Sequence, residues 1–234
     1  VSLMTIGCGA DVGPQPSGSL QIAEEHGRSI AAEAKRLLTD GTILLSGVPT
    51  VVSRRIQLPL VKPKSREYWQ AQLKSGGFEH QLAKAMLAKL DTQGSIPAEI
   101  SYPMSVWKFG NELAIVFLAG EVVVDYAVRL KRELDWSRLW INAWVNDMPG
   151  YIPSRRVLEE GGYEADFSQV YYEQPGRYDP DVEDKLVQAI RELVGEPFMA
   201  RADQEPSPYH KLPSGETLMF KRLANWVTGE RTEE

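Results

Sequence analysis

Residues 113–124 of the chain are LAIVFLAGEVVV, an almost unbroken apolar run interrupted only by Gly120 and Glu121. Its length suits a β-strand, and its continuous apolar character is typical of a central strand covered on both faces. A helical period follows, with apolar positions at Val123, Tyr126, Ala127 and Leu130. We therefore predict a strand that leads through Glu121 into a helix ending near Leu134, the unit from which α/β folds are built.

The segments on either side extend this pattern. Apolar alternation predicts strands over residues 2–8, 50–60, 102–109 and 139–145, with a tight hairpin turn at Gly110 and Asn111. Apolar residues at helical spacing predict helices over residues 20–39, 65–74, 79–90 and 181–194, and a short helix after Ser154. Residues 163–179 are predicted to form a long aromatic and acidic loop. The predicted fold class is α/β, a mixed sheet with helices packed on it.

Composition excludes several classes of protein. The 234 residues are 43% hydrophobic and carry a net charge of −6, so a basic nucleic-acid-binding surface is not expected. The longest apolar run is far shorter than the roughly 20 residues that a membrane-spanning helix needs. No signal peptide is visible. Cys8 is the only cysteine, so no internal disulfide and no thiolate metal cluster can form within one chain.

Two regions differ in composition. Residues 1–195 carry the strand and helix patterns and are predicted to form the α/β domain. Residues 196–234 begin with a polar, proline-bearing stretch that indicates a linker, followed by an apolar period from Leu218 to Trp226 that predicts a tail helix.

Glu121 and several tyrosines are the candidate functional residues. Glu121 follows a predicted central strand, where ligand sites of α/β sheets gather, although a glutamate there also suits the positive end of the next helix. Tyr151 and Tyr163 follow the strand predicted over residues 139–145, and a tyrosine-rich loop can equally pack its rings on the sheet. The three histidines, His26, His80 and His210, lack the spacing of paired metal ligands.

Three stretches together resemble the neutral (alkaline, non-lysosomal) ceramidase family. IGCGADVGPQ at residues 6–15 resembles the family's Gly-Asp-Val-Ser-Pro-Asn loop, and LAGEVV from Leu118 resembles its Pro-Gly-Glu turn. Residues 146–154 and 162–164 resemble its Asn-x-Tyr-x-x-Tyr-x-x-Thr … Tyr-Glu stretch. The likeness covers about residues 4–194, which would correspond to the C-terminal half of a larger ceramidase-like catalytic domain.

The resemblance implies a zinc amidase that cleaves N-acylated, lipid-like substrates outside the cytoplasm, in a secreted or periplasmic location. It assigns zinc binding to Glu121 and Tyr151 and substrate contact to Tyr163. The family's other two zinc ligands are histidines from segments that would precede this chain. We therefore expect this chain alone to bind zinc weakly or not at all.

One departure bears on activity. Gly13 stands where the family has a serine of the catalytic machinery, and a glycine offers neither a nucleophile nor a hydroxyl. Two functions therefore stay open: a fragment of a zinc-dependent hydrolase acting on an amide or related bond, and a non-catalytic binding domain that kept the fold. Because a parallel sheet is normally covered on both faces, we also expect self-association, or cover from the tail helix.

Overall fold

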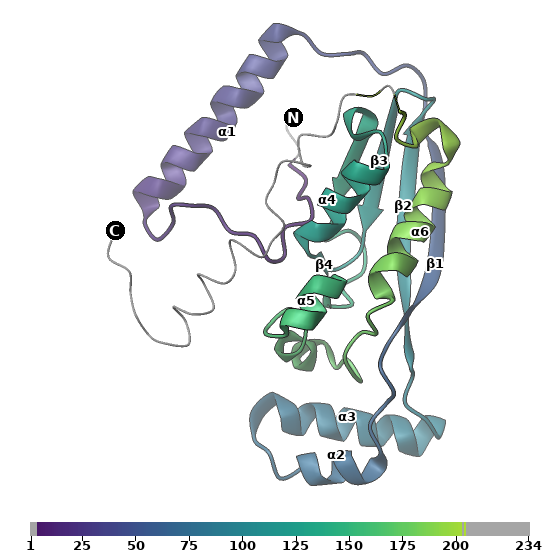
Figure 1. Ribbon diagram of the computed structural model, residues 1–234. Helices are drawn as coiled ribbons and strands as arrows, with labels where there is room; N and C mark the ends of the chain where they lie inside the picture. The colour runs from purple at the N-terminus through teal and green to yellow at the C-terminus, as the bar shows by residue number, and fades with distance from the viewer. Residues whose placement is uncertain (1–3, 203, 205–234) are drawn as a thin grey trace.

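The computed structural model describes residues 4–202 and residue 204, and Figure 1 shows their arrangement. It confirms the α/β class, because a mixed four-stranded sheet carries packed helices. The main sheet contains β1 (Thr50–Pro59), β2 (Glu99–Phe109), β3 (Leu113–Leu118) and β5 (Leu139–Asn142), and a small sheet pairs β4 (Glu121–Val122) with β6 (Tyr151–Ile152). The helices are α1 (Leu20–Asp40), α2 (Arg66–Gln72), α3 (Gly77–Gln93), α4 (Val124–Glu133), α5 (Arg155–Glu160) and α6 (Val182–Val194), with 3-10 helices η1 (Trp136–Arg138), η2 (Phe167–Tyr172) and η3 (Glu196–Phe198).

The main sheet has the order β1-β2-β3-β5. Strands β1 and β2 are antiparallel, as are β2 and β3, whereas β3 and β5 run parallel. The predicted hairpin is confirmed, since Phe109 pairs with Leu113 across the turn and its carbonyl oxygen accepts a 2.9 Å hydrogen bond from the Glu112 amide. The parallel β3–β5 pair is joined through β4 and α4, which makes the sheet mixed.

Helices α4 and α6 cover one face of this sheet (Figure 1). Helix α6 packs against β1 and β2 and also contacts α4. The expected inward positions of this segment are confirmed, because Val123, Tyr126 and Leu130 are fully buried and Ala127 is partly buried against the same core. The Tyr126 hydroxyl donates a 3.0 Å hydrogen bond to the Pro153 carbonyl oxygen, so the buried phenol keeps a polar partner.

The other face of the sheet is open. In β3, Ala114, Val116 and Leu118 are buried, whereas Leu113, Ile115 and Phe117 are only partly buried. Successive side chains of a strand point to opposite faces, so only alternate residues reach α4 and α6. The expectation of a strand covered on both faces is therefore wrong for the residues that the structure describes.

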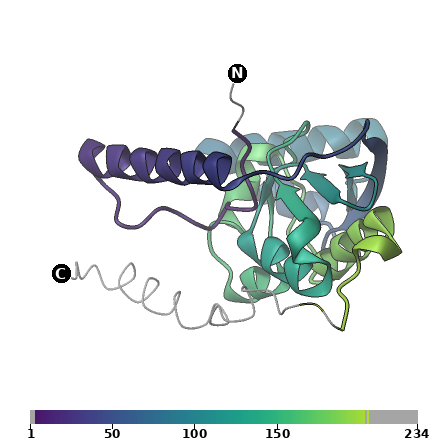
Figure 2. The same cartoon turned by 90° about the horizontal axis from the view of Figure 1, so that it is seen from above.

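Two helical parts lie outside this layer. Helices α2 and α3 form a hairpin beyond the lower end of the long β1 and β2 strands, with a small core of their own (Figure 1). Helix α1 stands clear of the sheet in both Figure 1 and Figure 2, and none of its residues is buried. Ser19, a residue type favoured at this position, caps the helix, since its hydroxyl accepts a 3.2 Å hydrogen bond from the Ile22 amide.

Three local predictions are wrong. Residues 4–8 are not a strand, although the Ile6 carbonyl oxygen accepts a hydrogen bond from the Ala143 amide. The predicted loop over residues 163–179 contains η2, which no apolar period announces. The sequence favours Asp179 as the cap of the helix predicted over residues 181–194, but the residue that precedes α6 is Asp181. The Asp179 carboxylate instead accepts a 3.0 Å hydrogen bond from the Asp181 amide.

The α/β core continues into residues 196–200. Phe198 is buried, and Met199 forms an isolated bridge with Leu134. The predicted tail helix from Leu218 to Trp226 lies outside the described residues. Among the helices that the structure describes, none combines the length and the apolar character needed to cross a membrane.

The covered face should carry most of the stability. Leu118→Ala removes a fully buried side chain and should lower the free energy of unfolding by about 2–5 kcal/mol. Leu38→Ala, at a position that is 76% exposed on α1, should change it by less than about 0.5 kcal/mol. Urea unfolding followed by circular dichroism measures both values. Equal losses in the two variants would contradict this placement of the core.

Candidate functional site

The candidate site forms where β4 leaves the end of β3 and pairs with β6. Glu121 and Tyr151 are direct register partners in this short parallel sheet. The Glu121 amide donates a 2.9 Å hydrogen bond to the Gly150 carbonyl oxygen, and the Val123 amide donates to the Ile152 carbonyl oxygen at 3.3 Å. Two segments thirty residues apart in sequence are thus fixed side by side at the carboxyl end of a central strand.

Two glycines allow this close approach. Gly120 has a φ of +72°, and a Cβ atom there would lie 2.5 Å from the Gly150 carbonyl oxygen. Gly150 has a φ of +106°, and a Cβ atom there would lie 2.9 Å from the Tyr172 ring. Only glycine tolerates both the conformation and the crowding, so the two glycines bring β4, β6 and Tyr172 together.

The Glu121 carboxylate is surrounded by phenol groups. The Tyr172 hydroxyl donates a 2.6 Å hydrogen bond to Glu121 Oε1, and Tyr151 lies on the neighbouring strand as the register partner of Glu121. The Tyr163 ring stands edge-on to the Tyr151 ring, with centroids 5.4 Å apart. The structure therefore brings together Glu121, Tyr151 and Tyr163, the three residues singled out from the sequence.

Tyr172 is a member of the cluster that the sequence does not single out, because no helical or strand period marks η2. Its contact with Glu121 depends on the glycine at position 150, against which its ring packs. A tyrosine 51 residues from its partner carries no spacing signal that a single sequence could reveal.

The electrostatics of the site keep the phenols protonated. Burial and the nearby Glu121 carboxylate raise the pKa of Tyr151 well above its ordinary value. The hydrogen bond to Glu121, together with burial, raises the pKa of Tyr172 to about 12. A nearby anion disfavours a second negative charge, so both hydroxyls act as hydrogen-bond donors near neutral pH. A bound cation would reverse this preference.

The donor set suits the oxygen half of a zinc site. A carboxylate oxygen is a normal zinc ligand, and a phenol becomes one when a cation favours its ionised form. The described residues supply no nitrogen ligand here: His26 contacts the Pro16 carbonyl oxygen, and His80 contacts the Leu73 carbonyl oxygen. Within residues 4–202 and 204, no group of three or more His, Cys, Asp or Glu side chains could hold a metal ion.

The loop that carries Gly13 docks along β4. The Ala10 amide donates to the Val122 carbonyl oxygen at 3.3 Å, and Asp11 Oδ1 accepts a 2.8 Å hydrogen bond from the Val124 amide at the start of α4. Asp11 Oδ2 also lies 3.4 Å from Arg156. The aspartate of this loop therefore has a structural role, holding the loop against the strand-to-helix turn. Gly13 is exposed, and a Cβ atom there would meet no atom within 4 Å.

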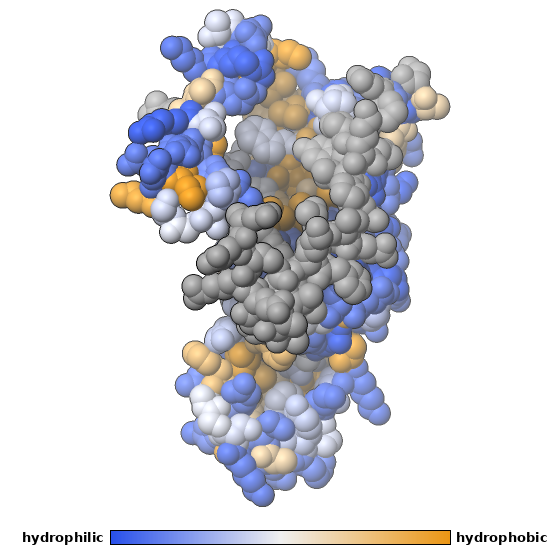
Figure 3. Space-filling view, turned by 60° about the vertical axis from the view of Figure 1, so that its left-hand side comes forward, coloured by the Kyte–Doolittle hydropathy of each residue, from blue (hydrophilic) through white to orange (hydrophobic). Residues whose placement is uncertain are grey.

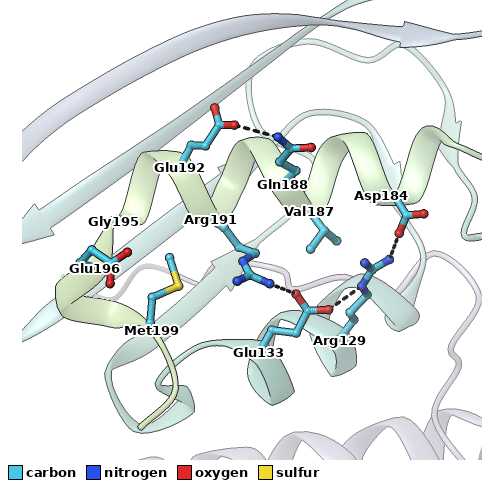
Figure 4. A pocket seen from close by; sticks show the side chains of 10 residues that line it. All are labelled: Arg129, Glu133, Asp184, Val187, Gln188, Arg191, Glu192, Gly195, Glu196 and Met199. Atoms are coloured by element: carbon cyan, nitrogen blue, oxygen red, sulfur yellow. Dashed lines mark hydrogen bonds and ion pairs between the residues drawn. The ribbon is translucent and has the colours of Figure 1, made fainter.

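A surface groove of about 690 Å³ lies apart from this cluster, between α4 and α6 (Figure 4). Figure 4 shows its ion pairs: Glu133 joins Arg129 and Arg191, each at 2.8 Å, and Arg129 also reaches Asp184 at 2.7 Å. Each of these charges already has a partner of opposite sign. We interpret the groove as the place where ion pairs join two helices of the covering layer.

Comparisons with protein family models, with curated proteins and with solved structures each found no match to this chain.

Removing the charge of Glu121 should make the phenols easier to ionise. Glu121→Gln removes the anion that raises both pKa values, so Tyr151 and Tyr172 should ionise at lower pH than in the wild type. An alkaline titration read by tyrosinate absorbance measures the change. Glu159→Gln, on the exposed side of α5, is the control and should leave the curve unchanged. An unchanged curve for Glu121→Gln would contradict the geometry of the cluster.

Proposed function

We propose that this chain is the ceramidase-like part of a zinc-dependent hydrolase that acts on an amide (N-acyl) or related bond. The observation that supports the proposal is the pairing of Glu121 with Tyr151, at hydrogen-bond distance from a further phenol at Tyr172. Zinc in such a site would act as a Lewis acid toward water and the scissile carbonyl. The proposed location is secreted or periplasmic, as in the family that the motifs resemble.

The chain's own residues would have distinct parts in this function. Glu121 and Tyr151 would offer oxygen ligands from neighbouring strands. Tyr172 would hold the Glu121 carboxylate in one orientation, the part that hydrogen-bonded neighbours of metal ligands commonly have. Tyr163 is 47% exposed and packs on Tyr151, so its ring is placed to contact a lipid-like or N-acylated substrate.

A zinc titration tests the ligand assignment. We expect weak binding by this chain, because its described residues offer oxygen ligands and no nitrogen ligand at the cluster. At high zinc concentration a rise in tyrosinate absorbance should appear, and it should be lost in Tyr151→Phe and in Glu121→Gln. Glu159→Gln is again the control and should retain the change.

Two results would contradict this assignment. A tyrosinate signal that persists in Tyr151→Phe would place the metal elsewhere. A tight stoichiometric site found by isothermal titration calorimetry would show that the ligand set is more complete than the cluster indicates.

A second function, a binding domain without catalysis, is favoured by Gly13. The hydroxyl that the family carries at this position is missing, although the surrounding space would accommodate one. The matched pair Gly13→Ser and Gly13→Ala decides between the two functions, because both add a Cβ atom and only serine adds a hydroxyl. Both should leave the free energy of unfolding within about 0.5 kcal/mol of the wild type.

Turnover of a fluorogenic N-acyl amide by the intact protein, with zinc present, is the discriminating measurement. Zinc-dependent turnover by the wild type would support the hydrolase. Turnover that appears only in Gly13→Ser, at least about tenfold above that of Gly13→Ala, would indicate a binding domain that lacks the catalytic hydroxyl. Equal and undetectable turnover in both variants would favour the binding domain.

A further inference from the structure

The open face of the sheet carries an apolar row that crosses all four strands. Val51 pairs with Trp107, Trp107 with Ile115, and Ile115 with Trp140, so one residue of each strand lies on this row. Trp140 is 51% exposed and Trp107 is 41% exposed. Phe117 extends the row, with its ring centroid 5.1 Å from that of Trp107. We call Val51, Trp107, Ile115, Phe117 and Trp140 the open face.

Exposed tryptophans in such a row point to a protein interface. Trp is enriched among the residues that dominate binding energy, and contiguous apolar patches are uncommon on the surface of monomeric proteins. The β3–β5 pair is also parallel, and parallel strands are normally covered on both faces. Among the residues that the structure describes, helices α4 and α6 cover the opposite face of the sheet, and no helix covers the open face.

Helix α1 carries the complementary surface. Its apolar and small residues recur at intervals of three and four and form one stripe, the α1 stripe: Leu20, Ala23, Gly27, Ile30, Ala34 and Leu37. Leu20 is 78% exposed, Ile30 is 55% exposed, and no residue of α1 is buried. No charged residue belongs to the stripe, and the ion pairs of Arg36 with Glu33 and Asp40 lie outside it.

An amphipathic helix of this kind needs a partner. Most helical stability in proteins comes from packing of an apolar face rather than from intrinsic propensity. Figure 3 shows hydrophobic side chains in the upper half of the molecule, where α1 and the sheet lie. One chain therefore presents both an unpartnered helix stripe and an unpartnered sheet face, the two surfaces that layered α/β folds bury against each other.

The segments before and after α1 are anchored on the α/β core. Before α1, the Ala10 and Asp11 contacts fix the chain on β4 and α4. After α1, the amide and hydroxyl of Ser46 each contact the Glu112 carboxylate at 3.3 Å, at the β2–β3 turn. Both ends are thus anchored while α1 stands clear of the sheet (Figures 1 and 2), which leaves the stripe accessible to a second copy.

We propose that two copies of this chain form a symmetric dimer in which the α1 stripe of each copy packs across the open face of the other. A two-fold dimer covers the α1 stripe and the open face of both copies at once. Two-fold symmetry is also the commonest symmetry of protein oligomers. This inference is independent of the proposed zinc chemistry.

The test uses the full chain in sedimentation equilibrium over a range of concentrations, with one variant on each surface. Trp140→Asp places a charge on the open face, and Ile30→Asp places one on the α1 stripe. Each should weaken dimerisation by at least about thirtyfold, as expected for a central interface residue. Phe167→Asp, at a position that is 69% exposed on η2, is the control and should dimerise like the wild type. Circular dichroism verifies that all variants are folded.

Mixing the two variants gives the sharpest result. The Trp140→Asp variant keeps an intact α1 stripe, and the Ile30→Asp variant keeps an intact open face. In the mixture these two intact surfaces can pack against each other, so a heterodimer should form through that one contact. In addition, Ile30→Cys mixed with Trp140→Cys and treated with oxidised glutathione, which accepts the two electrons, should form a disulfide-linked heterodimer, since the native Cys8 is buried.

Each other arrangement gives a different result and would overturn the proposal. A dimer joined by two open faces would survive Ile30→Asp. A dimer joined by two α1 helices would survive Trp140→Asp. A wild-type monomer at all concentrations would mean that α1 folds back on its own sheet or that a different protein covers the open face.

Discussion

The close approach of Gly120 to the Gly150 carbonyl oxygen is the contact on which the candidate site depends. A Cβ atom at Gly120 would lie 2.5 Å from that oxygen, so any other residue would separate β4 from β6. With the contact in place, the chain leaves the central strand, pairs Glu121 with Tyr151 and enters α4 within a few residues. The same turn therefore positions the polar cluster and starts the helix that covers the sheet.

The two faces of the sheet differ in how they are covered, although β3 is apolar on both. Ala114, Val116 and Leu118 are buried under α4 and α6, while Ile115 and Phe117 stay partly exposed on the other face. Transfer of apolar surface from water stabilises the covered face, and the open face retains the same driving force for association. The unpacked α1 stripe and the row through Trp107 and Trp140 are two consequences of this one-sided cover.

Much of the candidate site could be predicted from the sequence. Glu121, Tyr151 and Tyr163 each follow a predicted strand, and the motifs that include them resemble one family; the structure places the three side chains together. Tyr172 could not be predicted, because it lies in a 3-10 helix without a period and meets Glu121 only through the packing of its ring on Gly150. The protonated state of the phenols is likewise a property of the cluster, since it arises from burial and a shared carboxylate.

The sequence by itself determined the helices, most of the strands and the hairpin at Gly110, because caps, periodicity and turn residues act between neighbours in the chain. It also determined that β3 would be central. Only the tertiary structure decided which face of β3 is covered, that Asp11 holds its loop against α4, and that Tyr172 joins the Glu121 cluster. These outcomes depend on contacts between residues far apart in the chain, whose free energy is gained only when the intervening segments have packed.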